Sequence, residues 1–67
     1  MTLTINGDKA TFGNSLSVTE LLQQLGYEAS QRLAVAVNLE FIPRSAQSEH
    51  QLKDGDDVEI VAPMQGG

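Results

Sequence analysis

The sequence predicts an α+β domain in which one helix covers one face of a mixed β-sheet. Three observations support this fold class: an Asn6-Gly7 turn between two strand-like segments, one capped helix pattern at residues 17–25, and Val-rich segments after it. With 67 residues, the chain suffices for one hydrophobic core and is too short for two. We therefore expect one domain over residues 1–67, with a flexible C-terminal tail at residues 62–67.

The first two strands are expected to form a hairpin. Residues 2–5 alternate polar and apolar side chains, and the Asn6-Gly7 pair that follows is the strongest short-range hairpin signal. The return strand then runs from about Lys9 to Phe12. Gly13-Asn14 ends it, because both residues tolerate left-handed backbone angles.

A helix is expected to begin after Ser17. The Ser17 hydroxyl can accept from a free backbone amide of the first turn, and Glu20 can reach back to the Ser17 amide, as in a capping box. Apolar residues then follow at the spacing of one helix face: Val18, Leu21, Leu22 and Leu25. Gly26 is well placed to end the helix.

The rest of the chain predicts three more strands. Residues 33–39 alternate Leu and Val with smaller residues and are typical of a largely buried strand. Phe41-Ile42 favours a short edge strand closed by Pro43, residues 44–53 favour a loop, and residues 53–56 favour a turn. A last strand is expected over residues 58–61. The expected core residues are Leu3, Ile5, Leu21, Leu22, Val35, Val37, Val58 and Ile60.

The order of these elements favours a particular topology. The helix-containing crossover lets the first and last strands lie side by side and parallel. This is the β-grasp arrangement of ubiquitin-like domains.

Composition limits the possible functions. The net charge of −5 disfavours nucleic-acid binding, and the four basic residues Lys9, Arg32, Arg44 and Lys53 are scattered along the chain. With no Cys and a single histidine, His50, we expect no metal site, no bound cofactor and no enzymatic activity. Asp54, Asp56 and Asp57 are interpreted as turn and edge residues. No segment resembles a signal peptide or a membrane span, so we expect a cytoplasmic protein.

Several motifs together resemble one family. They are the Asn6-Gly7 opening, residues 17–22, residues 34–38 with Ile42-Pro43-Arg44, Asp54-Gly55-Asp56, residues 58–61 and Gly66-Gly67. In order and spacing they resemble the ThiS family, the sulfur carriers of bacterial thiamine biosynthesis. Some members have a third glycine where this chain has Gln65.

The resemblance implies a ubiquitin-like carrier that acts through its last residue. It implies that a ThiF-type adenylyltransferase uses ATP to adenylate the Gly67 carboxylate, that a sulfur donor protein converts it to a thiocarboxylate, and that thiazole synthase (ThiG) receives the sulfur. At about 3.3–3.6 Å per residue, the tail after Val61 can reach on the order of 20 Å into a partner. Gly66 and Gly67 suit a narrow channel because they lack Cβ atoms. We expect Phe41, Val61, Met64 and Gln65 to contact partners.

Three other functions remain open. The small subunit of molybdopterin synthase is a similar carrier that also ends in Gly-Gly. A modifier joined to lysines would use the same activated terminus, and a non-covalent ubiquitin-like binding module would need no tail. For Gly66-Gly67 themselves, the alternative interpretation is an unstructured chain end without function.

Overall fold

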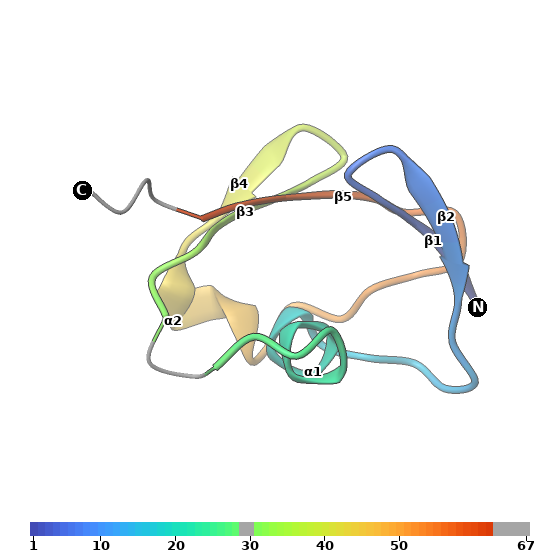
Figure 1. The fold of residues 1–67 in the computed structure, drawn as a ribbon, viewed down its shortest axis with the longest axis horizontal. Coiled ribbons are helices and arrows are strands. Elements are labelled where there is room, and N and C mark those ends of the chain that lie inside the picture. The colour runs from blue at the N-terminus through green and yellow to red at the C-terminus, as the bar shows by residue number, and fades with distance from the viewer. Residues whose placement is uncertain (29–30, 63–67) are drawn as a thin grey trace.

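A curved β-sheet with helix α1 against one face makes up the domain (Figure 1). The computed structural model describes residues 1–28 and 31–62, and in this part of the chain the sheet has five strands. The strands are β1 (Thr2–Ile5), β2 (Asp8–Thr11), β3 (Ala34–Val37), β4 (Glu40–Ile42) and β5 (Asp57–Val61). The helices are α1 (Val18–Gln24) and α2 (Arg44–Gln47).

The sheet has the β-grasp topology that the sequence predicts. The strand order is β2-β1-β5-β3-β4, with β1 and β5 parallel and all other neighbours antiparallel. The first and last strands therefore lie side by side at the centre of the sheet. As a result, the hairpin at the start of the chain directly supports the strand that leads to its end.

The predicted opening hairpin is confirmed. Asn6 and Gly7 have φ angles of 49° and 88°, so both central turn residues adopt the left-handed conformation that a tight hairpin needs. Strand β2 starts and ends one residue earlier than expected, at Asp8 and Thr11. The boundaries of helices and strands differ by one or two residues between ways of assigning them, so a difference of one residue is expected.

The predicted capping box at the start of α1 is also confirmed. The Glu20 backbone N–H donates to the Ser17 hydroxyl at 3.1 Å, and the Ser17 N–H donates to the Glu20 carboxylate at 2.9 Å. Leu25 lies at the C-cap and is 40% exposed, so the apolar face that packs on the sheet ends before it.

The strand expected at residues 33–39 is shorter in the structure. Asn38 and Leu39 have φ angles of 52° and 69° and form the turn between β3 and β4. Leu39 is therefore 86% exposed rather than part of the strand. The expectation of a largely buried strand is wrong for one face, since Ala34 is exposed while Val35 and Val37 are buried.

The loop expected at residues 44–53 contains structure. Arg44–Gln47 form the single turn α2, in which the buried Gln47 amide donates to the Ile42 carbonyl at 3.3 Å. Leu52 is 2% exposed and joins the core. One helical turn is too short to show a periodic pattern in the sequence, so this element was missed.

The core lies between the inner face of the sheet and α1. Of the expected core residues, Leu3, Leu21, Val35, Val37, Val58 and Ile60 are buried, whereas Ile5 and Leu22 are only partly buried against them. The structure adds four more buried apolar residues: Leu16, Val18, Ile42 and Leu52. None of the helices in residues 1–28 and 31–62 is both long and apolar enough to cross a membrane.

Candidate functional site

The last strand is held on both sides near its end. On one side β5 pairs with β3, where Ala34 is opposite Val61. On the other side the Asn6 carboxamide bonds the backbone of Ile60: its Nδ2 donates to the Ile60 carbonyl at 3.1 Å, and its Oδ1 accepts from the Ile60 N–H at 2.8 Å. The position at which the chain leaves the sheet is therefore fixed up to Val61.

Asn6 extends the parallel pairing of β1 and β5 beyond the backbone of β1. The backbone N–H groups of Thr4 and Asn6 donate to the carbonyls of Asp56 and Val58 at 3.0 and 2.9 Å. The next partner along β5 would be at residue 60, but β1 has already turned into the hairpin. The Asn6 side chain supplies both bonds there, which makes it a structural support of the end of β5 that the motif alone did not reveal.

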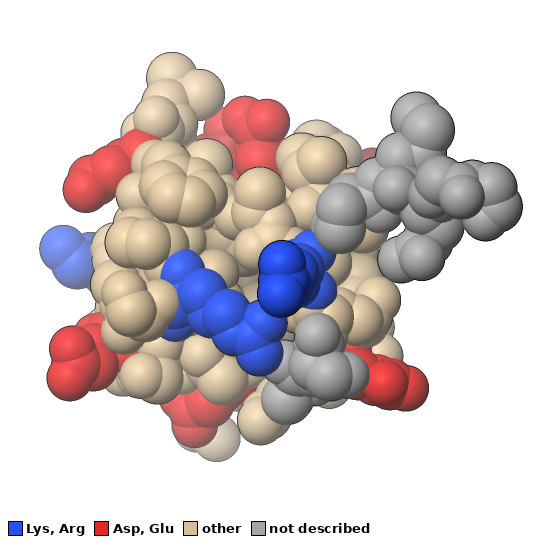
Figure 2. Space-filling model, turned by 90° about the vertical axis from the view of Figure 1, so that its left-hand side faces the viewer, with Lys and Arg blue, Asp and Glu red and all other residues tan. Residues whose placement is uncertain are grey.

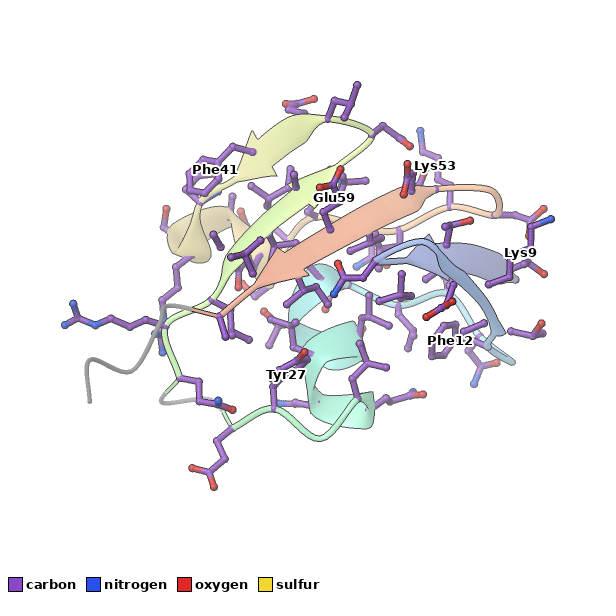
Figure 3. The ribbon with its side chains drawn as sticks, turned by 45° about the horizontal axis from the view of Figure 1, so that its top comes forward. Lys9, Phe12, Tyr27, Phe41, Lys53 and Glu59 are labelled. Atoms are coloured by element: carbon purple, nitrogen blue, oxygen red, sulfur yellow. The ribbon has the colours of Figure 1, made fainter. Side chains whose placement is uncertain are left out.

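The face of the sheet away from α1 carries an apolar patch next to this point. Phe41 is 64% exposed and Val61 is 60% exposed. Both lie on the outer face, because their partners on β3 alternate with the buried Val35 and Val37. Phe41, labelled in Figure 3, is opposite Ala36, and Val61 is opposite Ala34. Exposed apolar residues that gather on one face are typical of interaction surfaces.

This patch borders a shallow hollow, which we call the Phe41 groove. Six residues line it: Arg32, Leu33, Ala34, Phe41, Arg44 and Val61. They come from the segment before β3 and its first residue, from β4 and α2, and from the end of β5. The groove thus lies where β5 ends.

Two basic residues that are far apart in the sequence meet at the Phe41 groove. The sequence suggested that the four basic residues make no patch, and for Arg32 and Arg44 this expectation is wrong, since both line the groove. Viewed from the end of the molecule where β5 ends, basic side chains lie in the middle and acidic ones around the edge (Figure 2). The β3–β4 hairpin explains this, because its register places Val35 opposite Ile42 and so brings the segments beyond both residues together.

The predicted site residues divide into two sets. The structure brings Phe41 and Val61 to one groove. Met64, Gln65, Gly66 and Gly67 lie outside the described residues.

The acidic turn before β5 has a structural role. Asp56 is buried, and its carboxylate accepts from the Lys53 backbone N–H at 2.8 Å and from Asn38 Nδ2 at 2.9 Å. Asp54 accepts from the Thr2 backbone N–H at 2.6 Å. Within residues 1–28 and 31–62, no three His, Asp or Glu side chains are grouped as a metal site would require.

Comparison with known proteins gives one consistent result. The model of the ThiS family matches residues 3–67. A crystal structure of the thiamine biosynthesis protein ThiS from Geobacter metallireducens is 40% identical, with a TM-score of 0.85 and full coverage of both chains. A solution structure of a thiamine biosynthesis protein from the same organism is 40% identical, with a TM-score of 0.84 over all of this chain and 88% of the other.

A third relative is much longer. The thiazole synthase of Paramagnetospirillum magneticum is 43% identical over all 67 residues of this chain, which span 20% of the length of that protein. A segment similar to this domain is thus part of a larger polypeptide in that relative.

Proposed function

Because the chain belongs to the ThiS family, we propose that it carries sulfur for thiamine biosynthesis as a thiocarboxylate on Gly67. The observation that carries the proposal is the geometry at the end of β5. Asn6 and β3 hold this strand up to Val61, beside an exposed apolar groove, and Gly66-Gly67 follow a few residues later. A carrier needs this arrangement: a rigid domain that a partner can grip, next to a thin chain end that enters the partner's active site.

Activation of the terminus requires a partner that binds ATP. A Gly67 carboxylate oxygen attacks the α-phosphorus of ATP on a ThiF-type adenylating enzyme, and pyrophosphate leaves. The resulting acyl-adenylate has a good leaving group, which a free carboxylate lacks. A sulfur nucleophile at the oxidation level of sulfide then attacks the acyl carbon, and AMP leaves with the bonding electron pair. The product is a thiocarboxylate.

The chain itself supplies no sulfur. It has no Cys, so the sulfur must come from outside the chain, and no thiol of the same chain can capture the activated carbonyl group. A donor protein is the proposed source, and sulfide can take its place in a test. In the thiocarboxylate the negative charge is shared with a polarisable sulfur, which is nucleophilic when deprotonated. Gly67 then acts as both the carrier of the sulfur and the attacking group.

Thiazole synthase is the proposed acceptor. The relative from Paramagnetospirillum magneticum is itself named a thiazole synthase and contains a segment 43% identical to this chain. Two activities that cooperate gain a high effective concentration when they are joined in one polypeptide. This relative therefore supports a working contact between a domain of this kind and the synthase.

The Phe41 groove is the proposed contact with the adenylating enzyme. Phe41 and Val61 present exposed apolar surface at the end of β5, next to the segment that leads to Gly67, so we expect an enzyme that takes up the terminus to cover them. Met64 and Gln65, which lie closer to Gly67 in the sequence, are proposed to line the entrance to its active site. Buried apolar groups at the centre of an interface contribute most of the binding energy.

Intact-protein mass spectrometry tests this proposal. The chain is incubated with ATP and Mg²⁺, a ThiF-type enzyme and sodium sulfide, and a variant lacking Gly67 is the matched control. We expect a mass gain equal to one oxygen replaced by sulfur in the intact chain only. If the intact chain gains no mass while a known carrier does in the same mixture, the proposed function is wrong.

A further inference from the structure

The four basic residues of this acidic chain form two pairs at opposite ends of the sheet. Arg32 and Arg44 line the Phe41 groove. Lys9 and Lys53 lie at the other end, away from Phe41 (Figure 3). The two pairs carry the same formal charge. Changing one residue of each pair therefore distinguishes the effect of a charge at the groove from the effect of the net charge of the protein.

The arginine pair is held close to the groove by the fold. Arg44 begins α2 directly after β4, and its Nη1 donates to the Gln31 carbonyl at 3.4 Å. Arg32 follows Gln31 and leads into β3. The segment before β3 and the segment after β4 are therefore linked, and Arg32 and Arg44 both line the groove.

The charge at this location is opposite to that of the molecule as a whole. The chain has a net charge of −5, yet basic side chains occupy the middle of the end shown in Figure 2 and acidic ones its edge. A partner surface with carboxylates is repelled by most of this protein and attracted here. Such a contrast orients two proteins before they touch.

We propose that Arg32 and Arg44 bind carboxylates on the adenylating enzyme, next to the apolar groups that cover Phe41 and Val61. This inference rests on the proposed function and adds the chemistry of the partner surface. A guanidinium group suits such a contact, because its planar donors match a carboxylate in pairs and it is more weakly hydrated than an ammonium group.

Glu59 fixes the direction of docking. It is exposed on β5, opposite Ala36, which is in turn opposite Phe41, so these three residues form one row across the open face. The apolar patch therefore has a carboxylate on one side and the arginines on another. An enzyme surface docked the wrong way round would place its carboxylates on Glu59, and like charges at an interface are strongly unfavourable.

The test compares Arg32→Glu with Lys53→Glu. Both variants change the net charge equally, and both residues are exposed, so the comparison separates an effect at the groove from an effect of overall charge. Initial rates of adenylation are measured as pyrophosphate release with ATP, Mg²⁺ and the ThiF-type enzyme, at low and at high salt. For Arg32→Glu we expect the KM for the carrier to rise about tenfold at low salt, with kcat nearly unchanged, because a charge at the edge of an interface acts mainly on association.

Salt provides a second readout. Screening shortens the range of charge interactions, so the difference between wild type and Arg32→Glu should shrink at high salt. Arg44→Gln, which keeps a polar side chain on α2, should raise KM in the same direction. Equal thermal midpoints for wild type, Arg32→Glu and Lys53→Glu would show that the changes in KM are not caused by unfolding.

The outcomes separate this inference from the proposed function. If Arg32→Glu and Lys53→Glu raise KM equally, only net charge matters and the inference is wrong. If Arg32→Glu leaves KM unchanged, the inference is wrong while the carrier function stands. Absence of pyrophosphate release from the wild-type chain would instead contradict the proposed function.

Discussion

The Asn6 carboxamide forms two hydrogen bonds with the backbone of Ile60, which is 54 residues further along the chain. It thereby completes the pairing between β1 and β5 at the point where β1 turns away. Asn38 has a related position at the other end of β5, where its Oδ1 accepts from the Asp57 N–H at 2.9 Å and its Nδ2 donates to Asp56. Each hairpin turn thus supports one end of the last strand.

These two asparagines form a matched pair for mutation. Both have a positive φ angle, so Asn→Gly keeps the turn conformation and removes only the side-chain bonds. We expect Asn6→Gly and Asn38→Gly each to lower the free energy of unfolding by about 1–3 kcal/mol. Denaturant titration measures this change.

The two variants should differ in hydrogen exchange at the end of β5. In Asn6→Gly the Ile60 N–H loses its acceptor, so its hydrogen exchange should become faster than the change in global stability accounts for. In Asn38→Gly the Ile60 N–H keeps its acceptor. Its hydrogen exchange should therefore become faster only by the amount that the loss of global stability predicts. Equal exchange at Ile60 in the two variants would contradict the role assigned to Asn6.

The capping box of α1 predicts a second stability effect. Ser17→Ala removes the acceptor for the Glu20 N–H and should destabilise the domain by about 1 kcal/mol. Ser15→Ala is the control, since Ser15 is exposed and its hydroxyl lies at the long distance of 3.4 Å from Gln51 Oε1. Urea denaturation of both variants measures the difference, and an equal loss would argue against capping.

Two leucines with opposite burial test the extent of the core. Leu21 is 0% exposed, so Leu21→Ala leaves a cavity and should cost about 2–5 kcal/mol, a large fraction of the stability of a domain this small. Leu39 is 86% exposed, and Leu39→Ala should change stability by no more than about 0.5 kcal/mol. Thermal unfolding followed by circular dichroism compares them. A similar loss in both variants would contradict the assigned core.

Val61→Asp tests the apolar part of the proposed interface. Val61 is 60% exposed, so a charge there should leave the fold intact while it weakens contact with the adenylating enzyme. We expect the KM for adenylation to rise about tenfold or more, since a central apolar contact often contributes over 1 kcal/mol. Thr11→Asp, on the exposed edge strand β2, is the control. Unchanged adenylation kinetics in Val61→Asp would refute the contact.

Local signals predicted much of the fold. The Asn6-Gly7 turn and the Ser17–Glu20 capping box are formed by residues close in sequence, and the structure has both. The end of β3 was missed because Leu39, which has no preference for turns, adopts a φ of 69°. Asn38 tolerates a left-handed turn, but such an angle is rare for Leu, so the alternating pattern favours strand rather than turn at residue 39.

The candidate site depended more on distant contacts. Phe41 and Val61 could be proposed as partner contacts because a single helix leaves one sheet face open. The closeness of Arg32 and Arg44 follows from the register of the β3–β4 hairpin, and the support of Ile60 by Asn6 links opposite ends of the chain. Neither relationship is visible in the residues around one position of the sequence. A correct register for the β3–β4 hairpin would, however, have indicated that Arg32 and Arg44 lie close together.

The most direct test of the carrier function follows the sulfur itself. The chain is thiocarboxylated with heavy-isotope sulfur, purified, and mixed with thiazole synthase, its sugar phosphate substrate and the glycine imine. We expect the label to appear in the thiazole product while the carrier returns to the mass of its carboxylate form. If the label stays on the carrier with an active synthase, or is transferred only by a molybdopterin synthase large subunit, the assignment to thiamine biosynthesis is contradicted.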